Sequence, residues 1–263
     1  MRGKGRTRSF VWIVPFLAAC GASGDGARPS DGNDGAPPDA AAADARDPLD
    51  AQGPPSCRPP AGASGSPTSI GDVVALVNAL GAERSYPLAL SCVLQSFDRP
   101  LGFLAAKSTF SFQPSYDVHN PRVFLFSGNL VLTVIAVGAG RNLLEMGYQV
   151  SETRSIKAEI VFPVTAALPP SQPFDHIVHD GMTTCSSCHG TEIPAKDGSD
   201  GFETDILRPV TADEVDLASM RAEYTSCDPA LEPERCAILA AIFGQGDVVA
   251  RWFSPMAKTI YDN

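Results

Sequence analysis

Apolar residues recur along the chain with two different periods. Over 68–81 they return every three or four positions, which predicts one amphipathic helix capped by Ser69 or Asp72. Further along, they alternate with polar residues or form short unbroken runs, which is typical of β-strands. The turn residues at 127–129 predict a hairpin between two of these strands. The expected strands are 88–94, 101–105, 123–126, 130–137 and 156–162.

Helical periodicity returns after the proline-rich segment 168–173, which breaks regular structure. A capping-box pattern at 211–214 precedes one helix, and Pro233 fits the first turn of a second helix that runs to Phe243. A last short helix is expected over 248–253. We therefore predict an α+β protein. Its expected parts are a mainly antiparallel, sandwich-like β domain at 67–170 and a small helical, loop-rich domain at 171–263.

The first twenty residues have the layout of an export signal. Four basic residues precede an apolar stretch at 10–19 that is too short to span a bilayer. The end of this stretch, Leu-Ala-Ala-Cys at 17–20, resembles the lipobox of bacterial lipoproteins. The resemblance implies removal of the signal peptide 1–19 and a lipid anchor on Cys20. Gly21, not Asp, follows the cysteine, which by the same analogy favours the outer membrane over the inner membrane. The alternative is an ordinary secretory signal with an incidental cysteine.

Composition adds a tether and an acidic surface. Residues 20–66 are mostly Gly, Ala, Asp and Pro, so they cannot bury enough apolar surface to offset their ordering entropy and are expected to be disordered. The net charge is −10, and it becomes −14 on removal of 1–19, because four basic residues and no acidic residue are lost. This charge argues against nucleic-acid binding and favours basic protein partners. No apolar run reaches the roughly 18 residues of a membrane-spanning helix.

One motif carries recognisable chemistry. Residues 185–189 read Cys-Ser-Ser-Cys-His. Two thiols three positions apart can reach the two vinyl groups of one haem, and the adjacent imidazole then falls under the iron. Covalent haem attachment occurs outside the cytoplasm, which agrees with an exported chain. We therefore expect one haem c on Cys185 and Cys188, with His189 as an axial iron ligand.

The segment ahead of this motif supplies candidates for the sixth iron ligand. The run Phe-x-His-x-x-His resembles the class III, multihaem cytochromes c, in which an upstream histidine binds the iron. The resemblance covers 174–190 only and implies His176 or His179 as the distal ligand of a single haem. The downstream helices resemble a class I, single-haem cytochrome c, in which a later methionine is the ligand. An open or water-filled position is the third alternative. The methionine candidates, in order of preference, are Met256, Met220 and Met182.

Other interpretations of the same residues stay open. Zinc needs four ligands, and Cys185, Cys188 and His189 could supply three of them, with His176 or His179 as the fourth. A structural disulfide between the two cysteines is a further alternative. A thioredoxin-type redox pair is disfavoured, because the βαβ setting of such pairs is absent.

Four cysteines remain once Cys20 and the haem-attachment pair are assigned. Cys227 and Cys236 bracket a short loop that leads into a helix, so a disulfide between them suits an oxidising compartment. Cys57 and Cys92 would pair by elimination, which would join the end of the tether to the β domain. The alternatives are a buried free thiol at Cys92 and an intermolecular pair at Cys57.

Three functions fit these features. If protein side chains fill both axial positions, the haem carries single electrons between partners, and the protein is an electron carrier and not an enzyme. An open iron position would instead make a haem enzyme that handles peroxide or a small gas. In the third, the chain is a non-redox binding or scaffold lipoprotein with a structural Cys/His site. Each version places the protein on the periplasmic or cell-surface side of its membrane.

Overall fold

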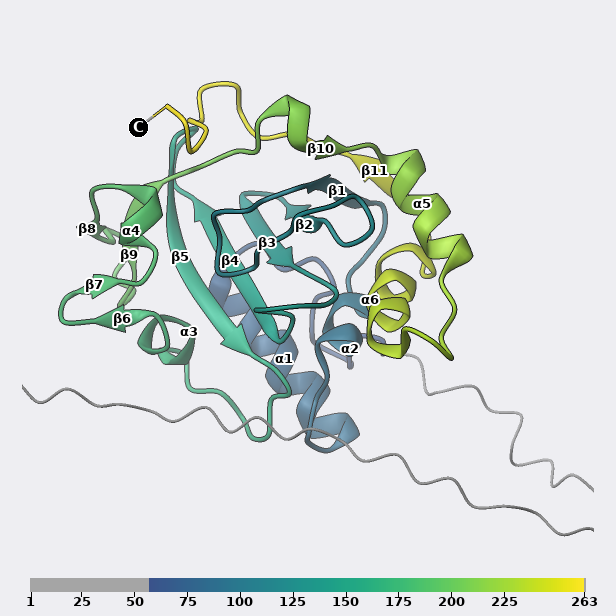
Figure 1. The fold of residues 1–263 in the computed structure, drawn as a ribbon. Helices are drawn as coiled ribbons and strands as arrows, with labels where there is room; N and C mark the ends of the chain where they lie inside the picture. Colours follow the sequence, from purple (N-terminus) through teal and green to yellow (C-terminus); the bar gives the residue numbers. More distant parts are fainter. Residues whose placement is uncertain (1–56, 263) are drawn as a thin grey trace, which may run out of the picture. The chain divides into compact units, whose positions relative to one another are not determined.

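The computed structural model describes residues 57–262, which fold around one sheet of nine strands (Figure 1). The predicted signal peptide, the predicted lipid anchor on Cys20 and the predicted tether up to residue 56 lie outside the described residues. A separate small hairpin pairs β6 (Val178–His179) with β7 (Met182–Thr183). The strands of the large sheet are β1 (Leu101–Ala106), β2 (Arg122–Ser127), β3 (Leu130–Val134), β4 (Leu143–Gln149), β5 (Arg154–Val161), β8 (Ile193–Pro194), β9 (Phe202–Asp205), β10 (Glu214–Val215) and β11 (Val248–Ala250).

The large sheet confirms the predicted mainly antiparallel α+β class. Its strand order is β10-β1-β2-β3-β4-β5-β9-β8, and β11 pairs with β1 in parallel beside this path. Strands β1 to β5 form an antiparallel meander, and the predicted hairpin joins β2 to β3. Strands β9, β10 and β11 follow the proline-rich segment, yet they pair with β5 and β1, which precede it. Independent folding of 67–170 and 171–263 stays a prediction.

Helices cover one face of the sheet, where a sandwich would place a second sheet (Figure 1). No helix within residues 57–262 is long and apolar enough to cross a lipid bilayer. Two of the helices, α3 and α4, are single turns. The helices are α1 (Ile70–Arg84), α2 (Leu90–Gln95), α3 (Gln172–Asp175), α4 (Ser186–His189), α5 (Leu217–Ser226) and α6 (Pro233–Phe243), with a 3-10 turn at Thr211–Asp213.

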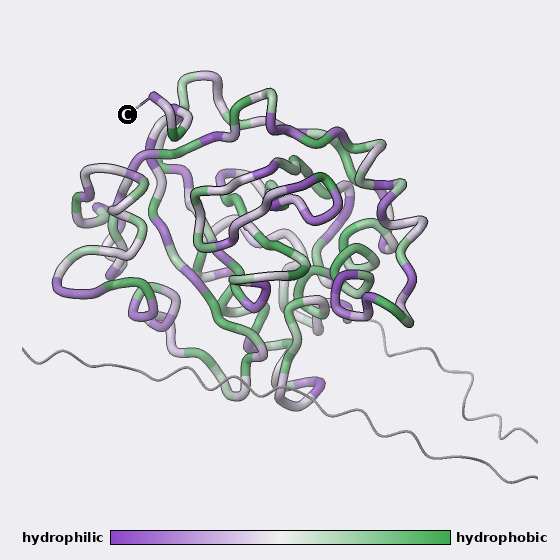
Figure 2. Tube along the Cα trace, viewed as in Figure 1, coloured by the Kyte–Doolittle hydropathy of each residue, from purple (hydrophilic) through white to green (hydrophobic). Residues whose placement is uncertain are grey.

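Alternation along the central strands gives the sheet two different faces. Residues such as Leu125, Leu144 and Ile156 face the helices and form the main core with them. Figure 2 shows hydrophobic positions concentrated in the central strands and in the helices behind them. The opposite face carries a smaller apolar cluster around Phe124, and polar side chains further along the sheet. The second face therefore combines a small packed cluster with polar side chains.

Helix α1 forms where the sequence predicts it, but it runs past the expected end. The Ser69 side chain accepts from the backbone N–H of Asp72, whose carboxylate accepts from the backbone N–H of Ser69, so the capping box is complete. Gly81 does not end the helix, which continues to Arg84. A Cβ atom at Gly81 would lie 2.3 Å from the Tyr86 ring, so the glycine permits a close approach.

Three other expectations were wrong. The apolar run 88–94 forms most of helix α2 (Leu90–Gln95), and only Leu88 makes an isolated β-bridge, with Val164. A short apolar run does not by itself separate helix from strand. The expected last helix at 248–253 is instead strand β11, which lies beside β1. The capping box at 211–214 is a 3-10 turn, and Asp216 caps α5 instead. Pro233 does begin a helix that ends at Phe243, as predicted.

Both predicted disulfides are present. Cys227–Cys236 joins the end of α5 to the first turn of α6, and Cys57–Cys92 joins the first described residue to α2. The backbone N–H of Cys57 also donates to the Gln95 side chain. The packed chain therefore begins before residue 67, where the sequence pattern places the start of the β domain.

A buried arginine links α6 to α5 and to the loop before β2. Arg235 is 1% exposed, and its guanidinium forms ion pairs with Glu223 and Glu232. It also donates to the backbone carbonyl of His119, at 2.8 Å from Nη2 and 3.1 Å from Nε. Removal of this side chain would leave two carboxylates and a carbonyl without their shared donor.

We expect Arg235→Ala to lower the free energy of unfolding by roughly 3 kcal/mol, because it breaks a buried, multiply bonded charge. Denaturant unfolding of the protein measures the change. Arg141→Ala is the control, since Arg141 pairs with Glu234 at 3.0 Å where both side chains are more than half exposed, and should cost under about 1 kcal/mol. Equal losses in the two variants would contradict the expected role of Arg235.

Candidate functional site

The Cys-x-x-Cys-His motif lies on the one-turn helix α4, and strand β9 holds it against the sheet. Strand β9 pairs with the start of β5, in a register that sets Thr204 opposite Ser155. The hydroxyl of Thr204 donates to the backbone carbonyl of His189 at 2.9 Å. The His189 ring bonds at Nδ1 to the backbone carbonyl of Asp205 at 2.7 Å. Two adjacent residues of β9 therefore fix both the backbone and the ring of the histidine.

This hydrogen bond determines the state of the His189 ring. A carbonyl oxygen can only accept, so Nδ1 carries the proton and Nε2 keeps its lone pair. Burial, with cationic Lys157 and Arg122 nearby, lowers the pKa of His189 to about 3. The imidazole is therefore neutral at physiological pH, in the tautomer that binds a metal through Nε2.

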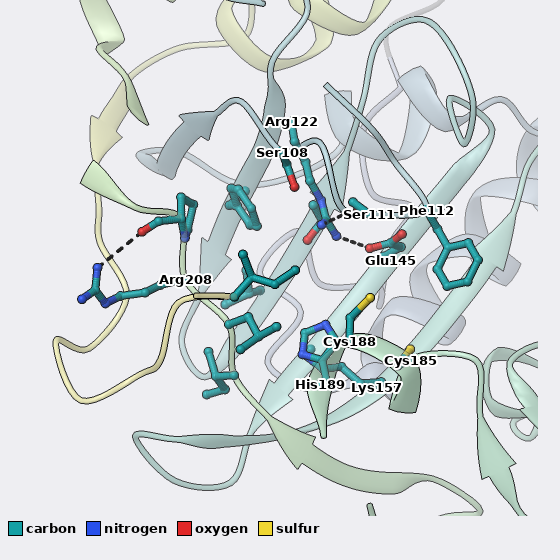
Figure 3. Close-up of a pocket in the computed structure, with 18 of the residues that line it drawn as sticks. Ser108, Ser111, Phe112, Arg122, Glu145, Lys157, Cys185, Cys188, His189 and Arg208 are labelled. Carbon is teal, nitrogen blue, oxygen red and sulfur yellow. Dashed lines mark hydrogen bonds and ion pairs between the residues drawn. The ribbon is translucent and has the colours of Figure 1, made fainter. Parts of the chain in front are cut away.

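The two cysteines of the motif are free thiols that line the same cavity as His189 (Figure 3). The structure therefore contains no Cys185–Cys188 disulfide. Thr183 anchors the start of the motif, because its hydroxyl oxygen accepts from the backbone N–H of Cys185 at 3.0 Å. Burial raises the pKa of the Cys185 thiol, although Lys157 acts against this shift. Both sulfurs are thus available for covalent chemistry.

The cavity lies on the face of the sheet opposite the main core. It encloses about 1300 Å³ of space, solvent at its open mouth included. Strands β2 to β5 form its floor, and α4 lies at one side with its two cysteines. The remaining walls come from the loop after β1, the segment after β9 and the C-terminal tail, which contribute 107–112, 206–210, Phe253, Ile260 and Tyr261.

One part of the cavity wall is apolar and aromatic. Phe124 packs edge-on against Phe253, with their ring centroids 5.3 Å apart. Phe110 and Phe112 also line the cavity, yet they are 65% and 56% exposed. Large aromatic side chains exposed beside a hollow are typical of a binding site for an apolar group. Ile177 and Ile206 extend this apolar wall.

The other part of the cavity is charged. Arg122 forms an ion pair with Glu145, donates to the Ser111 hydroxyl at 2.7 Å and lies over the Phe124 ring. No group in the described part of the chain accepts a hydrogen bond from the ammonium of Lys157. Part of the Lys157 side chain is accessible, but its ammonium is desolvated, which lowers its pKa to about 8. A cation without a carboxylate partner therefore remains in the cavity.

The predicted sixth iron ligands do not line this cavity. His176 Nδ1 lies 2.7 Å from the Glu159 carboxylate, and His179 is exposed on β6. Met256 and Met182 are 63% and 56% exposed. Met220 is buried in the main core. The structure thus brings Cys185, Cys188 and His189 into the lining of one cavity, and none of the distal candidates is part of that lining.

The zinc alternative finds no preformed ligand cluster. Among residues 57–262, no group of three or more His, Cys, Asp and Glu side chains is placed to hold a metal ion. His176 lies 2.7 Å from the Glu159 carboxylate and does not line the cavity that contains the two thiols. A zinc site would require these side chains to move.

Sequence reasoning missed the polar floor of the cavity. On β5, Ser155, Lys157 and Glu159 alternate with core residues, a pattern that predicts a strand with one face in solvent. The strand forms as the alternation predicts, but residues distant in sequence enclose its polar face as a cavity. The alternation is the only sequence signal that points to these three side chains.

The carboxyl group of Glu159 makes stability depend on pH. Burial and the nearby Glu145 raise its pKa to about 7 from 4.5, although His176 lies beside it. The folded state therefore binds more protons than the unfolded state between these values, and the free energy of unfolding falls as pH rises through this window.

We expect Glu159→Gln to gain stability relative to the parent protein between pH 5 and pH 8, because it removes a carboxylate that is costly to ionise. Denaturant unfolding at several pH values measures this difference. Glu152→Gln, at an exposed turn, is the matched control. A parent and a Glu159→Gln variant with the same pH dependence would rule out the raised pKa.

Comparison of the chain with known proteins identifies no relative. The chain matches no protein-family model, no curated protein and no solved structure with which it was compared. Its function must therefore be inferred from the cavity itself, where two free thiols and a neutral imidazole lie beside aromatic and cationic side chains.

Proposed function

We propose that this chain is an exported lipoprotein that carries one covalently attached haem c and transfers single electrons. Cys185 and Cys188 would form the two thioether bonds, and His189 would bind the iron. The observation that carries the proposal is the bond from His189 Nδ1 to the Asp205 carbonyl beside two free thiols, which leaves Nε2 as the ligating atom. A hydrogen bond of this kind orients a ligating histidine and increases its basicity.

The residues of the cavity fit such a group. A haem has a large apolar ring and two carboxylate side chains, and the cavity combines an aromatic wall with cationic groups. Phe110 and Phe112 would exchange solvent for contact with the ring. The haem would supply reversible one-electron chemistry at its iron, and the protein would tune it through the axial histidine, burial and nearby charge.

Charge and export support the proposed role. The predicted mature charge of −14 favours brief encounters with basic redox partners, and such attraction weakens as salt rises. The lipobox-like segment at 17–20 supports a lipid anchor on Cys20, with the outer membrane favoured. The two disulfides suit an oxidising compartment outside the cytoplasm.

A haem enzyme with an open iron position is the second candidate, and one observation favours it. Within the described residues, the cavity lining contains no imidazole besides His189, and its one methionine, Met146, belongs to the main core. The iron would then lack a protein ligand on its second side. Binding of carbon monoxide to the reduced protein would favour this candidate, and a low-spin spectrum that carbon monoxide leaves unchanged would favour the electron carrier.

We expect the protein, exported from cells with haem-attachment machinery, to be coloured and to stain for haem on a denaturing gel. Cys185→Ser with Cys188→Ser should abolish the stain, because no thioether bond can form. Ser187→Ala, which changes an exposed residue between the two cysteines, is the control and should keep it. A colourless parent protein would contradict the haem proposal. One zinc ion per chain in that colourless protein would support a structural metal site.

We also expect His176→Ala and His179→Ala to leave the visible spectrum of the haem protein unchanged, since neither side chain lines the cavity. Absorption spectra of the oxidised and reduced forms measure this. Loss of a low-spin spectrum in either variant would identify the changed histidine as the distal ligand and would show that the chain rearranges around the haem.

A further inference from the structure

Two polar side chains on β5 face the cavity without partners. The Ser155 hydroxyl is buried and forms no hydrogen bond within the described residues. Lys157, two positions along on the same face, likewise donates no hydrogen bond there. Both residues line the cavity. A buried hydroxyl without a partner costs free energy. The ammonium on the same face forms no ion pair within the described residues, so the two groups together indicate a missing acceptor.

Gly147 leaves room for that acceptor. It lies directly opposite Lys157 in the pairing of β4 with β5. A Cβ atom at Gly147 would lie 3.6 Å from the Ser155 hydroxyl oxygen and 3.7 Å from the Lys157 nitrogen. Ligand oxygens above the glycine can therefore approach both donors. Any larger residue at this position would occupy the same space.

The nearby anions are already engaged by other cations. Arg122 pairs with Glu145, and Asp205 accepts from Arg154 and Lys258 at 3.0 and 3.1 Å. The Cys185 thiol beside Lys157 is kept neutral by the burial that raises its pKa. Glu159, two positions from Lys157 on the same face, lies 2.7 Å from His176 Nδ1. Lys157 therefore has no ion-pair partner within the described residues, which favours an anionic ligand over a neutral one.

We propose that Ser155 and Lys157 form a subsite for one carboxylate group above Gly147. A carboxylate offers two oxygens, one to the hydroxyl and one to the ammonium, and the second bond is charge-assisted. Two sources have this chemistry: a propionate of the proposed haem, or a small free carboxylate. The first source rests on the proposed function, and the second does not.

The first arm of the test uses the full-length Cys185→Ser, Cys188→Ser protein, which cannot bond haem. Sodium propionate is titrated by calorimetry at constant ionic strength set with sodium chloride, after circular dichroism has shown a folded chain. We expect saturable binding that weakens about tenfold in Lys157→Gln, because a charge-assisted bond is lost. Ser155→Ala should weaken it by a smaller factor. Lys107→Gln is the control, since it removes another cavity lysine, one already paired with Asp213.

The second arm uses the haem-loaded protein and decides the source. If a haem propionate occupies the subsite, the loaded protein does not bind free propionate, and the haem propionate band in its resonance Raman spectrum shifts in both Lys157→Gln and Ser155→Ala. If the ligand is a free carboxylate, the loaded protein still binds it and the band is unchanged. If the haem-free chain does not fold, the second arm alone tests whether Ser155 and Lys157 bind a carboxylate.

The proposal is overturned if Lys157→Gln and Ser155→Ala behave like Lys107→Gln in both arms. In that result the parent chain binds propionate no better than Lys157→Gln does, and the haem propionate band does not shift in either variant. Failure of the haem proposal is a separate outcome, because a colourless protein can still be titrated with propionate.

Discussion

The antiparallel pairing of β9 with β5 is the constraint on which the candidate chemistry depends. It brings a segment that follows the proline-rich stretch onto the edge of the central meander. Thr204 and Asp205 on this strand then hold His189 from two directions. A one-turn helix such as α4 has little stability of its own. The sheet therefore supplies the rigidity that the motif lacks, and the motif supplies the reactive atoms.

The same sheet serves two environments because its side chains alternate. On β5, Ile156, Ala158 and Ile160 pack into the helix-covered core, while the residues between them point into the cavity. A shift of one residue in register would exchange the two sets, burying a lysine and a glutamate in the core. The hydrophobic face thus specifies where the polar face must lie, and the geometry of the cavity follows from core packing.

Features set by local sequence were predictable, whereas of the distant contacts only the Cys57–Cys92 disulfide was predicted, by elimination among the cysteines. The capped helix α1, the β2–β3 hairpin, strand β5 and helix α6 each carry a short-range signal. Strand β4 was missed because Glu145 and Gly147 interrupt its apolar pattern, and both face the cavity. The Cys-x-x-Cys-His motif was visible from its spacing alone. The set of side chains that line the cavity around it was not, because nearness in sequence to Cys185 does not place His176 among them.

The disulfide at Cys57 has a mechanical consequence. Everything that precedes this residue is connected to the fold through a covalent link to α2, which belongs to the helix-covered core. The cavity opens on the other side of the sheet. Traction applied along the N-terminal segment would therefore enter the helical layer and bypass the cavity walls. A protein held at its N-terminal end could be pulled and released while the mouth of the cavity keeps its shape.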